Sequence, residues 1–144
     1  ETEYPVVLLE SEELGDVLPI WIGRAEAAAI YNVLSKKTFK RPMTHDLIRV
    51  ITDTLGVVIA GVEITGIYKE TYFARIILER GKEVYYIDAR PSDSIALALR
   101  AEASIMIDSE LFEKYKRNLR VGQEDDVIKR MKELDPGDFG DMDL

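Results

Sequence analysis

The chain has 144 residues, of which 47% are apolar and none is cysteine, and its formal net charge is −8. A chain of this length makes one ordinary domain with a hydrophobic core, and the lack of cysteine excludes disulfides, thiolate metal sites and thiol catalysis. Because no apolar run approaches the roughly 20 residues that span a bilayer, and no secretory signal is visible, we expect a cytoplasmic protein without membrane contact.

The negative charge is concentrated at the carboxyl end. Residues 123–144 carry a balance of −5, while residues 1–122 carry −3. The body also contains a basic stretch of fourteen residues whose only acid is Asp46, and its cations are Lys36, Lys37, Lys40, Arg41 and Arg49. We therefore expect residues 1–122 to form the domain and residues 123–144 to add an acidic helix and tail.

The first half of the chain predicts a hairpin followed by two helices. Residues 4–9 and 17–22 are strand-like runs joined by a polar, glycine-containing connector. The period becomes helical over residues 24–34. A basic loop then leads to a second predicted helix, residues 44–55, which has an apolar stripe and Thr44 as its expected N-cap.

The second half predicts a β-meander packed against further helices. Three strand candidates, residues 57–67, 71–79 and 83–89, are joined by short turns. Ser92 is expected to cap a buried helix that runs to residue 100, and Ser109 a short helix after a strand at residues 104–107. These elements indicate an α+β fold, a single compact domain with a mixed, largely antiparallel sheet and several packed helices.

Three polar clusters lie in otherwise apolar surroundings, and the first contains Arg24 and Glu26. Glu26 falls on the apolar stripe of its predicted helix. A carboxylate that faces a core must be paired, bind a metal or become protonated. Glu26 is therefore either a structural residue, paired with arginine or favoured by the helix dipole, or a catalytic or metal-binding one.

The second cluster, residues 41–46, contains Arg41, His45 and Asp46 at a predicted helix N-terminus. This location favours anions such as phosphate, and the histidine is a candidate general base or metal ligand. The alternative is a capping segment without chemistry, in which Thr44 caps the helix and Asp46 interacts with its dipole.

The third cluster, residues 88–93, lies where a strand leads into a helix. Arg90 can bind a phosphate or a carboxylate with two parallel hydrogen bonds. The carboxylates of Asp88 and Asp93 suit Mg²⁺ or Mn²⁺ held through oxygen and water, as phosphodiester chemistry needs. The alternative is an arginine–aspartate pair that only fixes the turn.

Four segments together resemble the motifs of the bifunctional nuclease domain: residues 19–27, 41–47, 72–74 and 87–96. They occur in the family's order and spacing, and the resemblance covers about residues 4–110. It implies a compact α+β domain and a homo-oligomer, with a dimer as the first expectation. Members of the family resemble non-specific nucleases that act on DNA and RNA. An acidic tail replaces the UvrB/UvrC-type motif of some relatives, so recruitment through that motif is not expected.

The favoured function is a metal-assisted nuclease that acts on DNA and RNA. Asp88 and Asp93 are the expected ligands of Mg²⁺ or Mn²⁺. The other catalytic candidates are Glu26, His45 and Asp46, and the substrate-binding candidates are Arg24, Lys40, Arg41, Arg90 and Ser92. The alternatives are a non-catalytic oligomeric binding or scaffold module and a sensor of small anions or nucleotides. The nuclease hypothesis fails if the clusters lie far apart, or are dry and mutually paired.

Overall fold

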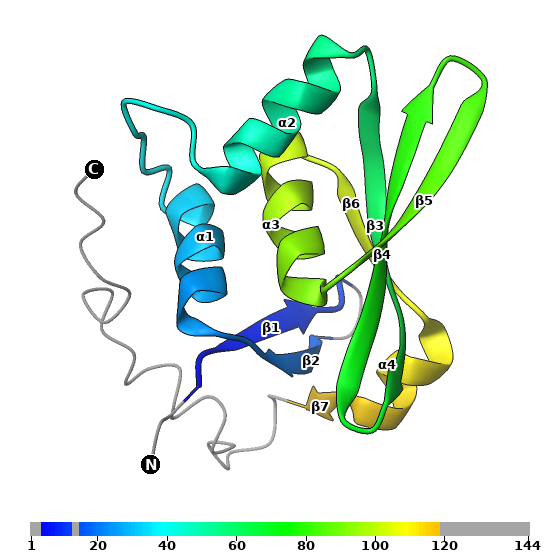
Figure 1. The fold of residues 1–144 in the computed structure, drawn as a ribbon. Helices are drawn as coiled ribbons and strands as arrows, with labels where there is room; N and C mark the ends of the chain where they lie inside the picture. Colours follow the sequence, from blue (N-terminus) through cyan, green and yellow to red (C-terminus); the bar gives the residue numbers. More distant parts are fainter. Residues whose placement is uncertain (1–3, 13–14, 119–144) are drawn as a thin grey trace.

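The structure is a computed structural model that describes residues 4–12 and 15–118. Its elements in chain order are β1 (Val6–Glu10), β2 (Asp16–Trp21), α1 (Arg24–Leu34), α2 (Thr44–Thr54), β3 (Val58–Tyr68), β4 (Thr71–Arg80), β5 (Glu83–Ala89), α3 (Pro91–Ala101), β6 (Ser104–Ile107), α4 (Ser109–Tyr115) and β7 (Arg117–Asn118). The predicted α+β fold is confirmed, with the strands divided between two sheets (Figure 1). The predicted acidic helix and tail lie outside the described residues.

The larger sheet has the strand order β5-β4-β3-β6. Its first three strands form the predicted antiparallel meander, and β6 joins β3 in parallel. The smaller sheet is antiparallel and consists of the β1–β2 hairpin and β7. In the described part of the chain, no helix is long and apolar enough to cross a membrane.

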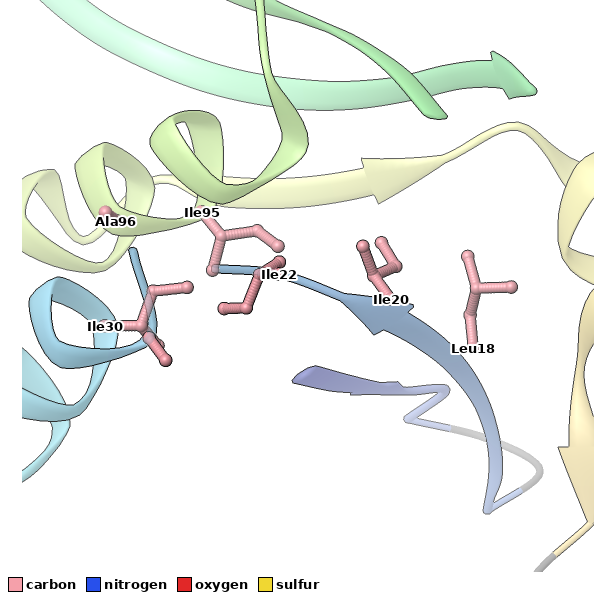
Figure 2. Packing of buried hydrophobic residues seen from close by; sticks show 7 residues of the cluster. Leu18, Ile20, Ile22, Ile30, Ile95 and Ala96 are labelled. Carbon is pink, nitrogen blue, oxygen red and sulfur yellow. The ribbon is translucent and has the colours of Figure 1, made fainter. Parts of the chain in front are cut away.

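Helix α3 lies at the centre of the core, as its apolar sequence predicts. On one side Ile95 packs in one cluster with Leu18 and Ile20 of β2 and with Ile22, which follows that strand (Figure 2). On the other side Leu97 packs against β3 and β4 of the larger sheet. Because α3 is buried on both sides, its amino-terminal turn is held in a fixed position.

Helix α2 differs from the usual amphipathic helix, whose apolar stripe faces a core. None of its residues is buried, and Leu47, Ile51 and Leu55 on the stripe are between 46% and 62% exposed. The helix is instead held on α3 by polar contacts, in which His45 binds Asp93 and residues 46 and 49 bind Arg100. The apolar stripe is therefore left on the surface.

The predicted caps of three helices, Thr44, Ser92 and Ser109, are wrong by one or two residues. Helix α3 begins at Pro91, because proline suits the first helical position and leaves Arg90 as the N-cap. At α4 the carboxylate of Asp108 accepts a hydrogen bond from the backbone N–H of Leu111 at 3.0 Å, since an aspartate before the first turn is an equally good cap. At α2 the N-cap is Met43.

Candidate functional site

One or two residues from each of the three polar clusters meet in space, although the clusters belong to different helices. Nε2 of His45 on α2 lies 2.9 Å from Oδ1 of Asp93 on α3. Arg90 donates to both Asp93 oxygens, at 2.8 and 3.2 Å, and to Oε1 of Glu26 on α1 at 3.0 Å. We call these four residues, Glu26, His45, Arg90 and Asp93, the central cluster.

The position of Glu26 depends on the glycine that precedes α1. A Cβ atom at Gly23 would collide with the carboxylate of Glu26, while the backbone of Gly23 has an ordinary φ of −73°. The lack of a side chain at Gly23, rather than an unusual backbone conformation, leaves this space for the carboxylate. It allows Glu26 to fold back over the first turn of α1, where the helix dipole favours a negative charge.

The central cluster lines an open cavity of about 660 Å³. Such a volume lies within the range of about 300–1,000 Å³ that is usual for ligand sites. Part of the wall of this cavity is apolar and includes Ile48, Ile76, Ile87 and Leu97. The side chains of Arg90, Asp93 and Glu26 are 62%, 31% and 23% exposed. The cluster is thus mutually paired but open to solvent, so a ligand can reach it.

The ion pairs shift the pKa values of Asp93 and Arg90. Burial tends to raise the pKa of the Asp93 carboxyl, but the hydrogen bonds from Arg90 and His45 outweigh it and hold that pKa below its ordinary value. The carboxylates of Asp93 and then Glu26 raise the pKa of Arg90. With a neutral imidazole, the formal charge of the central cluster is −1, which favours the approach of a cation.

A buried arginine, Arg100, which the sequence prediction missed, connects α3 to α1 and α2 next to the central cluster. The side chain of Arg100 on α3 is 7% exposed and its Nε lies 2.6 Å from Oδ1 of Asp46. Its other nitrogens donate to the carbonyls of Ala96 and Ala29, at 2.9 and 3.0 Å. Asp46 also accepts from the N–H of Met43 at 3.1 Å. The sequence did contain a signal for this residue, because a charged residue in the apolar run of α3 must be buried with partners for its guanidinium.

Of the predicted substrate-binding residues, Arg90 lines the cavity, and Arg24, Lys40, Arg41 and Ser92 lie outside its lining. Arg24, Lys40 and Arg41 are exposed, and none of them has an ion-pair partner among residues 4–12 and 15–118. Arg24 directly precedes Ala25, and Arg41 is two residues before Met43, both of which are in the cavity wall. Ser92, in contrast, is 7% exposed.

The predicted metal ligands Asp88 and Asp93 are not brought together. Asp88 lines a second hollow on the other face of the larger sheet, beside Arg75 and Tyr86, while Asp93 lines the cavity on the helix side. Over the described ranges, no group of three or more histidine, cysteine, aspartate or glutamate side chains is close enough to hold a metal ion. Two carboxylates, Glu26 and Asp93, share the guanidinium of Arg90.

Known proteins match most of the chain. A family model described as the bifunctional nuclease domain matches residues 6–120. Uncharacterised proteins of two Mycobacterium tuberculosis strains are 38% identical over 150 residues, which cover 94% of this chain and 88% of theirs. Bifunctional nuclease 1 of Arabidopsis thaliana is 26% identical over 82% of this chain and 37% of its own length. Bifunctional nuclease 2 of the same plant is 24% identical over 96% of this chain and 42% of its own length. This chain therefore spans less than half of either plant protein.

Proposed function

The chain belongs to the bifunctional nuclease domain family, and from this membership we propose that it is a nuclease that hydrolyses phosphodiester bonds of DNA and RNA without sequence preference. The observation that carries the proposal is the meeting of three helix N-terminal turns in the central cluster, in the wall of an open cavity. Helix N-termini favour phosphate groups. The plant relatives named bifunctional nucleases add support.

Arg90 is the proposed binding residue for the scissile phosphate. Its planar guanidinium matches two phosphate oxygens as well as it matches a carboxylate. In the structure its donors are occupied by Glu26 and Asp93, so an incoming phosphate would take over some of these hydrogen bonds. The exposed cations Arg24, Lys40 and Arg41 would bind neighbouring phosphates of the backbone.

His45 is the proposed general base. Because Asp93 is ionised and accepts from Nε2 of His45, the hydrogen of a neutral imidazole belongs on Nε2 and the basic nitrogen is Nδ1. In the proposed reaction Nδ1 takes a proton from the attacking water. The water oxygen bonds to phosphorus, the bond from phosphorus to the leaving oxygen breaks, and solvent protonates that oxygen. Asp46, adjacent in sequence, is tied to Arg100 and positions the turn.

A divalent cation, Mg²⁺ or Mn²⁺, is the proposed cofactor. The excess negative charge of the central cluster supports this proposal, and Glu26 and Asp93 are the carboxylates that would hold the ion. Mg²⁺ commonly takes only one or two protein carboxylates and completes its shell with water and substrate phosphate, which suits this pair. When bound, the ion would polarise a phosphoryl oxygen and lower the pKa of the attacking water. Asp88 has no place in this set, because it lines the other hollow.

A homodimer is the proposed assembly, with the apolar stripe of α2 as its interface. Leu47, Val50, Ile51 and Leu55 are 46–62% exposed. An apolar surface of this kind on a single helix is usual at protein–protein interfaces. The same surface also favours the alternative function, a non-catalytic oligomeric binding module, in which the ion pairs of Arg90 are only structural.

Cleavage assays separate these two functions. Purified protein would be incubated with labelled single- and double-stranded DNA and RNA in Mg²⁺, Mn²⁺ or chelator, beside Arg90→Gln and a control, Arg80→Gln, whose side chain is 57% exposed at the end of β4. The nuclease proposal predicts metal-dependent cleavage that is lost only in Arg90→Gln. Salt-sensitive binding of nucleic acid without cleavage under any metal would favour the binding module.

A further inference from the structure

The larger sheet has a second face that the proposed reaction does not use. Helices α1, α2 and α3 lie on one side of this sheet (Figure 1), and α4 packs on the same side through Leu111, which contacts Ile64 and Ala74. Among the described elements, no helix covers the opposite face. A hollow of about 530 Å³ lies there, and its wall includes Thr65, Gly66, Phe73, Arg75, Tyr86 and Asp88.

Two aromatic side chains are exposed at this hollow, on adjacent strands. Phe73 of β4 is 44% exposed and Tyr86 of β5 is 58% exposed. The register pairs Arg75 with Asp88 and Ile77 with Tyr86, so alternation along the strands places these side chains on one face with Phe73. Exposed aromatic side chains on neighbouring strands are the means by which several RNA-binding sheets stack unpaired bases.

Gly66, which is opposite Phe73 in the register, leaves room at the hollow. A Cβ atom added there would meet no atom within 4 Å, and the residue has no positive φ. Neither the packing nor the backbone of this chain therefore requires glycine at this position. Since glycine weakens a strand and often marks the close approach of a ligand, the space beside Phe73 is suited to an occupant.

The carboxylate of Asp88 is an unused acceptor at the edge of the same hollow. Its cross-strand neighbour Arg75 has other partners: it donates to Glu63 at 2.8 Å and lies 4.5 Å from the ring centroid of Tyr86. Asp88 has no hydrogen bond or ion pair in the part of the chain that is described. A ligand with an N–H donor would satisfy it, whereas a phosphate group would be repelled.

We propose that this hollow binds one unpaired base of a single-stranded nucleic acid, with Phe73 stacking on the base and Asp88 accepting a hydrogen bond from its exocyclic amino group. The inference rests on the proposed function only in taking nucleic acid as the ligand, because the hollow lies on the other face of the sheet from the central cluster. The amino group of cytosine suits the carboxylate, and the corresponding carbonyl of thymine or uracil does not. The site therefore prefers oligo-dC to oligo-dT.

Binding of labelled oligo-dC and oligo-dT of equal length, followed by fluorescence anisotropy in chelator, tests this site without cleavage. Phe73→Ala should weaken binding of both oligonucleotides by roughly tenfold, and Phe73→Tyr should restore it. Asp88→Asn should abolish the preference for oligo-dC, because an amide can also donate to the thymine carbonyl. The matched control is Tyr85→Ala, since Tyr85 is a neighbouring exposed tyrosine on the opposite face of β5.

Three results would overturn the base-binding site. The first is that Phe73→Ala binds the oligonucleotides as tightly as the unaltered protein. The second is that Phe73→Ala and Tyr85→Ala lose the same amount of affinity. The third is that Phe73→Ala dissociates a dimer and leaves oligonucleotide binding unchanged. The last result would make this face an interface between copies. Failure of the unaltered protein to bind any oligonucleotide in chelator would overturn the base-binding site, whereas the cleavage assay in Mg²⁺ or Mn²⁺ decides the nuclease function separately. Base-selective binding by a protein that never cleaves would leave this site standing and overturn only the nuclease function.

Discussion

His45 and Asp93 are 48 positions apart in the chain, yet Nε2 of one lies 2.9 Å from Oδ1 of the other. Their contact joins the first turn of α2 to the first turn of α3, and Arg90 extends it to Glu26 on α1. The four side chains thus come from the amino-terminal ends of three helices. The central cluster therefore responds to changes in helix packing as well as to changes in its own side chains.

Gly23→Ala should separate activity from stability. Its φ of −73° suits alanine, and a less flexible unfolded chain would even favour the variant by about 0.4–1 kcal/mol. The new Cβ would, however, push the Glu26 carboxylate away from Arg90. We expect the Tm to stay close to that of the unaltered protein while cleavage falls by roughly tenfold or more. Full activity in this variant would show that the position of Glu26 is unimportant.

Arg100→Met should be strongly destabilising. The side chain of Arg100 is only 7% exposed, and the change removes its hydrogen bonds to Asp46 and to the carbonyls of Ala29 and Ala96. Breaking a buried pair in this way costs about 3 kcal/mol of the free energy of unfolding. The control Arg80→Met, at an exposed position, should change it by less than about 0.5 kcal/mol. Urea unfolding measures the free energy of unfolding of both variants. Equal losses would show that Arg100 does not support the site.

The contribution of Asp93 to stability should disappear in acid. The pKa of its carboxyl is lowered in the folded protein, so its ion pairs stabilise the fold above the ordinary carboxyl pKa and this stabilisation is lost as pH falls through the folded value. The difference in unfolding free energy between the unaltered protein and Asp93→Asn should be constant from about pH 7 to 5 and shrink below about pH 4. Urea unfolding across this range measures the difference. A constant gap down to about pH 2.5 would contradict the assignment.

The double variant Leu47→Glu/Ile51→Glu should dissociate the proposed dimer. Both side chains are about half exposed on α2, so the substitutions should hardly affect the folded monomer. In a symmetric interface they would bring like charges together, which opposes association. Light scattering at matched concentrations measures the mass. A monomer in both the unaltered and the variant protein would exclude this interface.

Local sequence patterns predicted most of the helices and strands, but they did not predict which other parts of the fold pack against each one. The meander of β3, β4 and β5 was predicted correctly because its strands alternate and its turns are short. The stripe on α2 was also recognised as apolar. Its exposure could not be predicted, since periodicity identifies a face and gives no information about a partner. The exposed stripe follows from polar contacts to α3, which depend on residues about 50 positions away.

The candidate site was predicted in part, for a similar reason. Polar residues in apolar surroundings identified Glu26, His45, Arg90 and Asp93, which the structure brings together. Asp88 and Asp93 are five residues apart, but the junction between β5 and α3 directs them to opposite sides of the sheet. The sequence does not fix that direction, because it depends on how α3 packs on the sheet.

Cleavage by an Asp93→Asn variant tests the central claim most directly, since Asp93 connects Arg90 and His45. Single- and double-stranded DNA and RNA would be incubated in Mg²⁺, Mn²⁺ or chelator with three identically purified proteins: the unaltered chain, Asp93→Asn and the control Asp53→Asn. Asp53 has a side chain that is 62% exposed on α2. We predict metal-dependent cleavage by the unaltered protein and by Asp53→Asn, and none by folded Asp93→Asn. Equal cleavage by all three proteins would contradict a nuclease site at the central cluster.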